Sequence, residues 1–150
     1  MQNENKLDLI IWGATGFTGQ LVCQHIKNTY SKTKLIWGIA GRNKEKLLTI
    51  CKKLNLNEKM IFIADSNNIE SLIKLCSQTK VICTTVGPYA KHGTNLIEAC
   101  IKTGTNYCDI TGETQWIRRI IDKYHKKAEE KSIKIINSCG FDSIPSDMGV

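Results

Sequence analysis

Several features that would assign the chain to a specialised class of protein are missing from its 150 residues. It has two prolines and no low-complexity tract, so nothing marks a linker between domains. No apolar run approaches the ~20 residues that a membrane-spanning helix needs. The opening residues, MQNENK, lack the apolar region of a secretory signal peptide. Together with 41% hydrophobic residues, these absences predict a globular, cytoplasmic protein without a membrane span.

The cysteines and histidines do not form the pattern of a metal site or of a disulfide framework. The seven cysteines are odd in number and include no CxxC pair, and the three histidines are far apart. Most of the cysteines lie at apolar positions of predicted helices or strands, where cysteine acts as a small hydrophobic residue. We therefore expect no bound metal, and reduced, buried thiols at every position except Cys139.

The net charge of +7 raises the question of a nucleic-acid partner. Lysine supplies 18 of the 21 basic residues, and these lysines are scattered from Lys6 to Lys134 without a basic run. A binding arm or a one-sided basic face would need them clustered. The scatter predicts that the chain does not bind nucleic acid.

Short apolar segments alternate with amphipathic ones along the whole chain. The predicted strands cover residues 7–12, 34–40, 60–64, 81–86, 106–110 and 133–137. Three of the predicted helices cover about 17–28, 44–54 and 114–131. Another begins at a capping box of Asn67 and Glu70, and a further one begins at Thr94 and ends at Gly104. In the first helix we expect Phe17, Leu21, Val22 and Ile26 on the buried side.

Because the strands are apolar throughout, both faces of the predicted sheet are buried. This predicts an α/β fold, a Rossmann-like doubly wound parallel sheet of about six strands with helices on both faces. Residues 1–150 form one domain in this interpretation. The segment CGFDSIPSDMGV begins a new helix capped by Ser143 only a few residues before Val150. We therefore expect the chain to be the N-terminal domain of a longer protein.

The stretch WGATGFTG follows the first predicted strand and opens the first helix. In a βαβ unit such a turn binds a pyrophosphate at the helix N-terminus. Gly13 permits the tight turn, Gly16 lets the backbone approach the phosphates, and Gly19 lets helix and strand pack closely. The predicted phosphate-binding residues are Gly13, Ala14, Thr15, Gly16, Phe17, Thr18 and Gly19. The spacing GxxGxxG is a variant of the usual fingerprint, and the alternative is a turn with a purely structural function.

The residues at the end of the second strand, IAGRNK, indicate which dinucleotide the site prefers. An NAD site has a carboxylate here, about 20 residues beyond the glycines, to bind the ribose hydroxyls. Arg42 and Asn43 stand there instead, and an arginine can bind a 2′-phosphate through a charge-assisted contact. This favours NADP over NAD, with a solvated loop arginine as the alternative. Asp65, at the end of the third strand, is a candidate contact to the adenine or the start of a turn.

The motifs WGATGFTG, IAGRN, TTVGPYAKHG, YCDITGETQW and CGFDSIPSDMG resemble those of the saccharopine dehydrogenase-like oxidoreductases, closest to the branch of the trans-acting enoyl reductases. The resemblance covers essentially the whole chain. It implies an NADP-binding Rossmann domain followed by a catalytic and dimerising domain, so the full-length parent is expected to be a homodimer. The segment GFDSIPSD replaces the glycine-rich segment ending in histidine of true saccharopine reductases, which argues against saccharopine as the substrate.

The resemblance also assigns functions to residues that follow the later strands. Val86, Gly87 and Pro88 correspond to the loop beside the cofactor. Tyr89, Asp109 and Cys139 are the candidate catalytic residues, because their counterparts border the nicotinamide and substrate. Tyr89 or Asp109 is a candidate proton relay, with a surface tyrosine and a capping aspartate as the alternatives; for Cys139 the alternative is packing.

The function that the resemblance implies is hydride transfer between NADPH and an imine or enoyl group of a small-molecule or lipid substrate. The chain has no Tyr-x-x-x-Lys pair at the position used by short-chain reductases. The alternative is a scaffold or sensor that binds NADP without turnover.

Overall fold

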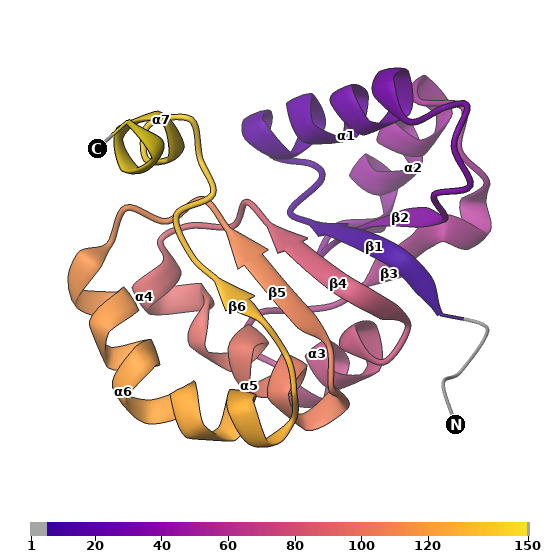
Figure 1. The fold of residues 1–150 in the computed structure, drawn as a ribbon. Coiled ribbons are helices and arrows are strands. Elements are labelled where there is room, and N and C mark those ends of the chain that lie inside the picture. Colours follow the sequence, from indigo (N-terminus) through magenta and orange to yellow (C-terminus); the bar gives the residue numbers. More distant parts are fainter. Residues whose placement is uncertain (1–5, 150) are drawn as a thin grey trace.

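The computed structural model describes residues 6–149, and its centre is a six-stranded, all-parallel sheet (Figure 1). The strands are β1 (Leu7–Trp12), β2 (Trp37–Gly41), β3 (Ile61–Ile63), β4 (Thr79–Thr84), β5 (Asn106–Asp109) and β6 (Ile135–Ile136). Their order in the sheet is β3-β2-β1-β4-β5-β6, so the chain returns to the middle of the sheet after β3. This is the order of a dinucleotide-binding Rossmann fold, and it confirms the predicted fold class.

The described part of the chain also contains seven α-helices and one short 3-10 helix, all of which lie between strands except the last, which follows β6. They are α1 (Phe17–Thr29), α2 (Lys44–Lys53), η1 (Glu58–Met60), α3 (Ile69–Cys76), α4 (Tyr89–His92), α5 (Thr94–Thr103), α6 (Thr114–Glu130) and α7 (Ile144–Met148). Figure 1 shows α1 and α2 on one face of the sheet and α3, α5 and α6 on the other. Gly104 ends α5 in a left-handed conformation (φ 67°), as its position after the apolar periodicity predicts.

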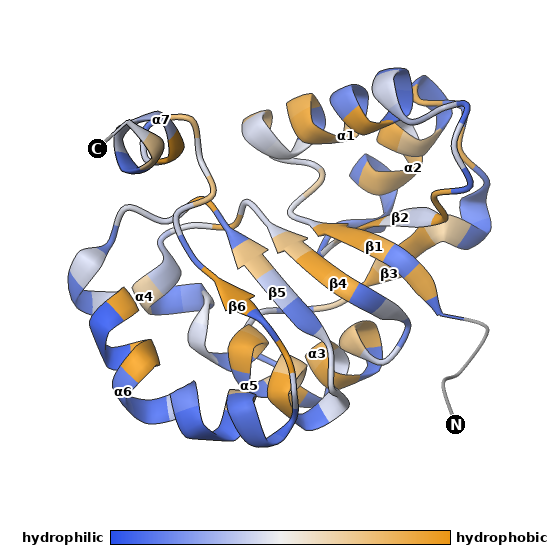
Figure 2. Cartoon of the chain, viewed as in Figure 1, coloured by the Kyte–Doolittle hydropathy of each residue, from blue (hydrophilic) through white to orange (hydrophobic). Residues whose placement is uncertain are grey.

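Two hydrophobic cores lie on opposite faces of the sheet because successive side chains of a strand point to opposite sides. In β1, Ile11 packs in the core under α1 and α2, whereas Ile10 and Trp12 pack in the core with α3, α5 and α6. All three are at most 2% exposed. Figure 2 shows hydrophobic residues along β1, β4 and β6, and the hydrophilic side of α6 turned outward.

The buried side of α1 differs from the prediction. Gly19, Cys23 and Ile26 are buried, whereas Phe17 is 83% exposed and Leu21 is 53% exposed. Close contact between α1 and the glycine turn determines which side faces the sheet, and this places the small Gly19 inward. The expectation that Phe17 and Leu21 are buried was therefore wrong.

Local details at three other positions also differ from the prediction. Asn68, not Asn67, caps α3, with its side chain accepting a hydrogen bond from the Ser71 amide (3.0 Å). β2 begins at Trp37 rather than at residue 34. The short helix α4 lies in a segment expected to be loop. In the described range, no helix is both long and apolar enough to cross a membrane.

Candidate functional site

The glycine turn joins β1 to α1 at the carboxyl edge of the sheet. Gly13 has a left-handed backbone (φ 88°), and a Cβ there would lie 2.5 Å from Val86 Cγ2. A Cβ on Gly19 would lie 2.1 Å from the Gly13 carbonyl oxygen. The fold itself therefore requires glycine at both positions, because each alternative side chain would collide with neighbouring atoms.

Gly16 is different, because the protein alone gives no reason for glycine there. Its backbone is extended (φ −77°, ψ 166°), and the nearest atom to a methyl group at this position would be the Gly13 oxygen at 3.4 Å. Such a methyl group would instead occupy open space in front of the helix. The bare backbone at Gly16 thus leaves room for a group outside the protein, which is what close approach of a pyrophosphate requires.

The N-terminus of α1 has the polarity that such a group needs. Gly16 is the N-cap and has no side chain to accept from the amides of the first turn, and that turn contains no acidic residue. The first N–H groups of a helix have no partner within the helix, and its dipole places partial positive charge there. An anion in front of Gly16 would therefore meet free N–H donors.

A cleft of about 270 Å³ lies directly over this turn, at the point where the sheet order reverses between β1 and β4. Six of the predicted cofactor residues line it: Gly13, Thr15, Gly16, Arg42, Val86 and Gly87. Arg42 is exposed and forms no ion pair with another residue of the 6–149 range. Its guanidinium is available to an anionic ligand in the cleft.

Seven predicted cofactor residues do not line the cleft: Ala14, Phe17, Thr18, Gly19, Asn43, Asp65 and Pro88. Ala14 is fully buried, so its side chain packs in the core. Asn43 caps α2 by accepting from the Lys46 amide (2.9 Å), and Asp65 accepts from the Asn67 amide (2.8 Å) in a turn. These contacts explain both polar side chains by local structure.

Sequence reasoning missed three polar residues of the cleft: Ser66, Thr85 and His92. Ser66 is 3% exposed, and its hydroxyl lies 3.2 Å from His92 Nδ1. Ser66 directly follows Asp65 at the end of the third strand, and His92 belongs to the motif VGPYAKHG. Both residues follow a strand of the predicted sheet, and this position could have marked them as candidates. The spacing of the histidines tests only for a metal site, and so it does not single out His92.

The candidate catalytic residue Tyr89 lies in the interior rather than in the cleft. The residue is 6% exposed, and its hydroxyl donates to the carbonyl oxygen of Thr84 (3.2 Å). Burial raises the pKa of Tyr89 to about 12. A hydroxyl so placed favours a packing function over proton transfer.

Asp109 is 1% exposed, and both of its carboxylate oxygens are occupied. Oδ1 accepts from the amides of Thr111 (3.1 Å) and Ser138 (3.0 Å). Oδ2 accepts from the Tyr107 hydroxyl (2.8 Å) and from Asn137 Nδ2 (2.7 Å). The two bonds from Asn137 and Ser138 join the end of β5 to the segment after β6, and the geometry favours a structural function for this carboxylate.

Cys139 is exposed, and two of the cysteines expected to be buried, Cys83 and Cys108, are only partly buried. The Cys139 amide donates to the Asp109 carbonyl (2.7 Å), which places the thiol beside the end of β5. Partial desolvation, followed by the nearby Cys108 and Asp109, raises the pKa of the Cys139 thiol above its ordinary value. The thiolate, which is the nucleophilic form, is thereby disfavoured.

Glu113 is a further residue that the sequence did not single out. Its carboxylate oxygens accept from the backbone amides of Tyr89 (2.6 Å) and Ala90 (2.8 Å). These are the first two residues of α4, so Glu113 caps that short helix from the start of α6. It thereby fixes the chain just after Val86 and Gly87, which line the cleft.

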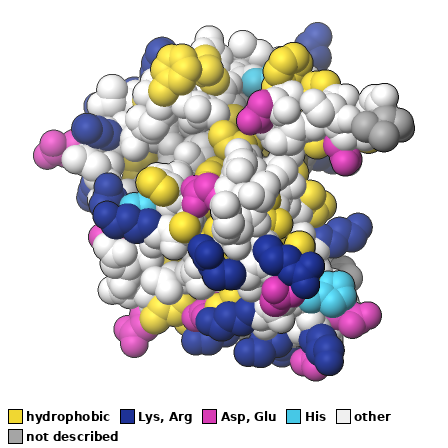
Figure 3. All heavy atoms as spheres, turned by 90° about the vertical axis from the view of Figure 1, so that its left-hand side faces the viewer, with side chains coloured by type: hydrophobic (Ala, Val, Ile, Leu, Met, Phe, Trp, Pro, Cys, Tyr) yellow, Lys and Arg dark blue, Asp and Glu magenta, His cyan; other side chains and the backbone are white. Residues whose placement is uncertain are grey.

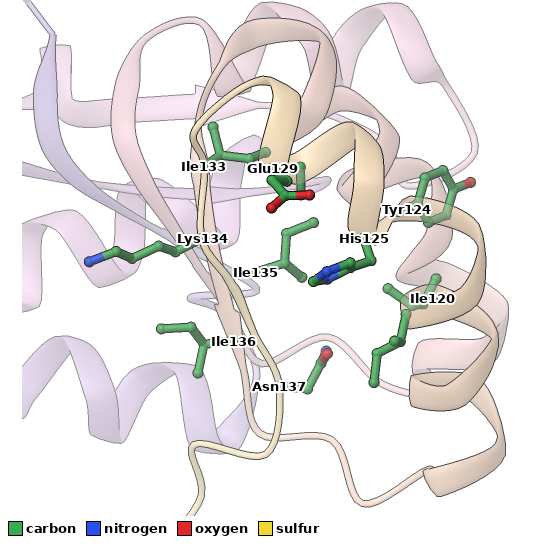
Figure 4. Close-up of a pocket in the computed structure, with 11 residues that line it drawn as sticks. Ile120, Tyr124, His125, Glu129, Ile133, Lys134, Ile135, Ile136 and Asn137 are labelled. Carbon is green, nitrogen blue, oxygen red and sulfur yellow. The ribbon is translucent and has the colours of Figure 1, made fainter.

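A larger hollow of about 400 Å³ lies elsewhere, between α6 and β6 (Figure 4). Five isoleucines are among its eleven lining residues, with His125 and Glu129 from α6 and Asn137 after β6. It shares no residue with the cleft over the glycine turn. Figure 3 shows acidic and hydrophobic side chains among the Lys and Arg on the face toward which α6 is turned.

Comparison with known proteins identifies the family. The model of the saccharopine dehydrogenase NADP binding domain matches residues 9–136, which include β1 to β6 almost entirely. The chain belongs to this family.

Curated relatives agree with this assignment. The trans-acting enoyl reductase of Mycobacterium tuberculosis is 40% identical over 147 residues, and that of Mycobacterium leprae is 37% identical over 148. These alignments cover 98% and 99% of the chain. The chain spans only about a third (35%) of the length of either relative.

Solved structures share the fold of this NADP-binding domain. Apo saccharopine dehydrogenase (L-Glu forming) from Saccharomyces cerevisiae superimposes with a TM-score of 0.72 at 17% identity, over 91% of this chain and 28% of that chain. Triphenylmethane reductase from Citrobacter sp., solved in complex with NADP(H), gives a TM-score of 0.65 at 18% identity, over 87% of this chain and 48% of that chain.

Proposed function

We propose that the cleft over the glycine turn holds NADP, and that the chain is the NADP-binding domain of an oxidoreductase that transfers hydride between NADPH and an imine or enoyl substrate. The single observation that carries the site is the open position at Gly16, in front of the uncapped N-terminus of α1. The family and the names of the curated relatives support reduction of an enoyl group.

The residues present fit this cofactor. The first-turn amides of α1 bind the pyrophosphate, and Gly16 admits it. Arg42, at the end of β2, binds the 2′-phosphate that distinguishes NADP from NAD. When bound, NADPH supplies the hydride, and the protein orients it.

The loop after β4 completes the site in this proposal. Val86 and Gly87 line the cleft opposite the glycine turn, and Glu113 holds the following helix in place. Residues 1–150 then act as one cofactor-binding domain, and a small-molecule or lipid substrate, together with any dimer contact, belongs to the full-length parent.

Arg42→Ala tests the cofactor assignment. We expect the affinity for NADPH to fall about 10- to 100-fold, because one charge-assisted contact is worth roughly 1.5–3 kcal/mol. The affinity for NADH should stay nearly unchanged, since NADH lacks the 2′-phosphate. Fluorescence titration of both nucleotides measures the two constants.

Arg119→Ala is the matched control, because Arg119 is also exposed but lies on α6, away from the cleft. Equal losses for NADPH and NADH in Arg42→Ala would contradict the assignment of the 2′-phosphate. In the full-length protein, binding of NADPH without turnover of any imine or enoyl substrate would favour the sensor alternative.

A further inference from the structure

Ser66 and His92 come from segments that follow different strands, contact each other and line the cleft. Ser66 lies after β3 and His92 ends α4, which follows β4. These two strands are not neighbours in the sheet, because β2 and β1 lie between them. The contact between the Ser66 hydroxyl and His92 Nδ1 (3.2 Å) therefore spans the reversal point of the sheet.

The position of Ser66 is itself fixed. Its carbonyl oxygen accepts from Asn95 Nδ2 (3.0 Å), which ties it to α5, and its side chain is almost fully buried. His92 is only partly buried, and its backbone amide donates to the Pro88 carbonyl (3.0 Å). With Nδ1 engaged by Ser66, Nε2 is the ring nitrogen left for a ligand.

The proposed function determines which part of the cofactor lies here. The pyrophosphate lies at the glycine turn after β1, and the 2′-phosphate lies at Arg42 after β2. The ribose joining these phosphates is thereby placed. Ser66 and His92 line the same cleft, together with residues 85–87 of the loop after β4. The adenine base is the part of NADP that continues from this ribose.

We infer that His92, oriented by Ser66, contacts the adenine base of NADP and selects a purine that carries an amino group. This inference rests on the proposed function. When Nδ1–H of His92 donates to the Ser66 hydroxyl, Nε2 carries no proton and can accept a hydrogen bond from the 6-amino group of adenine. Ser66 acts as a positioning residue by holding Nδ1, so that the ring keeps one orientation.

The test is a titration with two nucleotides that differ only in the base. These are NADP⁺ and its hypoxanthine analogue, in which the 6-amino group of adenine is replaced by oxygen. For His92→Ala we expect NADP⁺ affinity to fall about 3- to 10-fold, the range of one ordinary hydrogen bond. The loss for the hypoxanthine analogue should be clearly smaller.

A double-variant cycle separates positioning from general damage to the fold. Ser66→Ala alone should weaken NADP⁺ binding, but it should add little further loss in the His92→Ala background. Urea unfolding of each variant reports on the fold itself, and His125→Ala on the distant α6 is the control variant. A structural defect would weaken the binding of both nucleotides equally and would lower the urea concentration at the midpoint of unfolding.

Equal affinity of the wild type and His92→Ala for NADP⁺ would overturn the inference. So would an equal loss of affinity in His92→Ala for NADP⁺ and for its hypoxanthine analogue. Independent, additive losses from Ser66→Ala and His92→Ala would remove the positioning function of Ser66. If the wild type bound neither nucleotide, the proposed function itself would fail, which is a distinct result.

Discussion

Three glycines in one turn differ in what the protein requires of them. Gly13 and Gly19 are required by backbone geometry and packing, respectively, and the protein's own atoms explain both. Gly16 has an ordinary backbone and room for a side chain, so the described protein atoms do not require glycine there. The spacing of the motif predicted the turn at Gly13 and the close packing at Gly19, and the phosphate contact at Gly16 stays a prediction.

Alanine substitutions should separate packing from binding. Gly16→Ala should change the free energy of unfolding by no more than about 0.5 kcal/mol, since the site is open, while weakening NADPH binding at least about 10-fold. Gly19→Ala should cost roughly 1–3 kcal/mol of stability, because its Cβ would overlap the Gly13 carbonyl. Urea unfolding and NADPH titration measure both effects. Strong destabilisation by Gly16→Ala would show that the turn, and not a ligand, requires this glycine.

The polar candidates could be predicted less well than the glycines. Sequence places Tyr89 and Asp109 at strand ends, where a ligand site is expected. It does not reveal that the Tyr89 hydroxyl turns inward to Thr84, or that four donors from two segments of the chain surround Asp109. Such partners depend on tertiary contacts, so catalysis by either residue stays a prediction that the geometry does not favour.

At the scale of elements, hydrophobic periodicity predicted the existence of the helices better than their buried sides. In α1 the apolar positions Phe17 and Leu21 face outward, since Gly19 must face the turn. The start of α3 also differs from the prediction. Asn67 and Asn68 are both suitable N-cap residues, but Asp65 accepts from the Asn67 amide in a turn, and the Asn68 side chain caps the helix. Helix α4 was missed because its cap, Glu113, lies far along the chain.

Besides the hydrogen bond from Trp116 Nε1 to Thr94 Oγ1 (3.1 Å), the contact between α5 and α6 includes the carboxylate of Glu98. This carboxylate accepts hydrogen bonds from the Tyr124 hydroxyl and from Lys123 Nζ (3.3 Å). The Tyr124 hydrogen bond, followed by Lys123, holds the pKa of Glu98 below its ordinary value. A carboxyl group whose pKa is lowered on folding stabilises the fold above its unfolded pKa, and this contribution is lost as the pH falls through the folded pKa.

Glu98→Gln should therefore lower the free energy of unfolding at pH 7 by about 1 kcal/mol. The difference from the wild type should shrink as the pH falls below about 4, where the wild-type carboxylate also becomes protonated. Urea unfolding at a series of pH values measures this. Glu130→Gln, an exposed residue at the end of α6, is the control and should show no such dependence. A difference that persists unchanged at pH 3 would show that the charge of Glu98 contributes nothing.

At the scale of the whole molecule, the cleft joins the two halves of the sheet. Its residues follow β1, β2 and β3 on one side of the reversal point and β4 on the other. A ligand there contacts both halves, whereas a ligand in the hollow between α6 and β6 would contact only the far edge (Figures 1 and 4). The larger volume of that hollow does not make it the cofactor site, because it has neither a helix N-terminus nor an arginine among its lining residues.

Amide hydrogen exchange should distinguish the two locations. NADPH should slow exchange at residues 13–19 and 85–87 together, because one molecule contacts both segments, and should leave residues 120–137 unchanged. At a concentration 100 times its dissociation constant, it should also raise the free energy of unfolding by about 2.7 kcal/mol. Gly16→Val, whose side chain fills the space before α1, should abolish both effects. Protection confined to residues 120–137 would place the nucleotide in the hollow between α6 and β6 and would contradict the cofactor site, since no contact there involves the glycine turn.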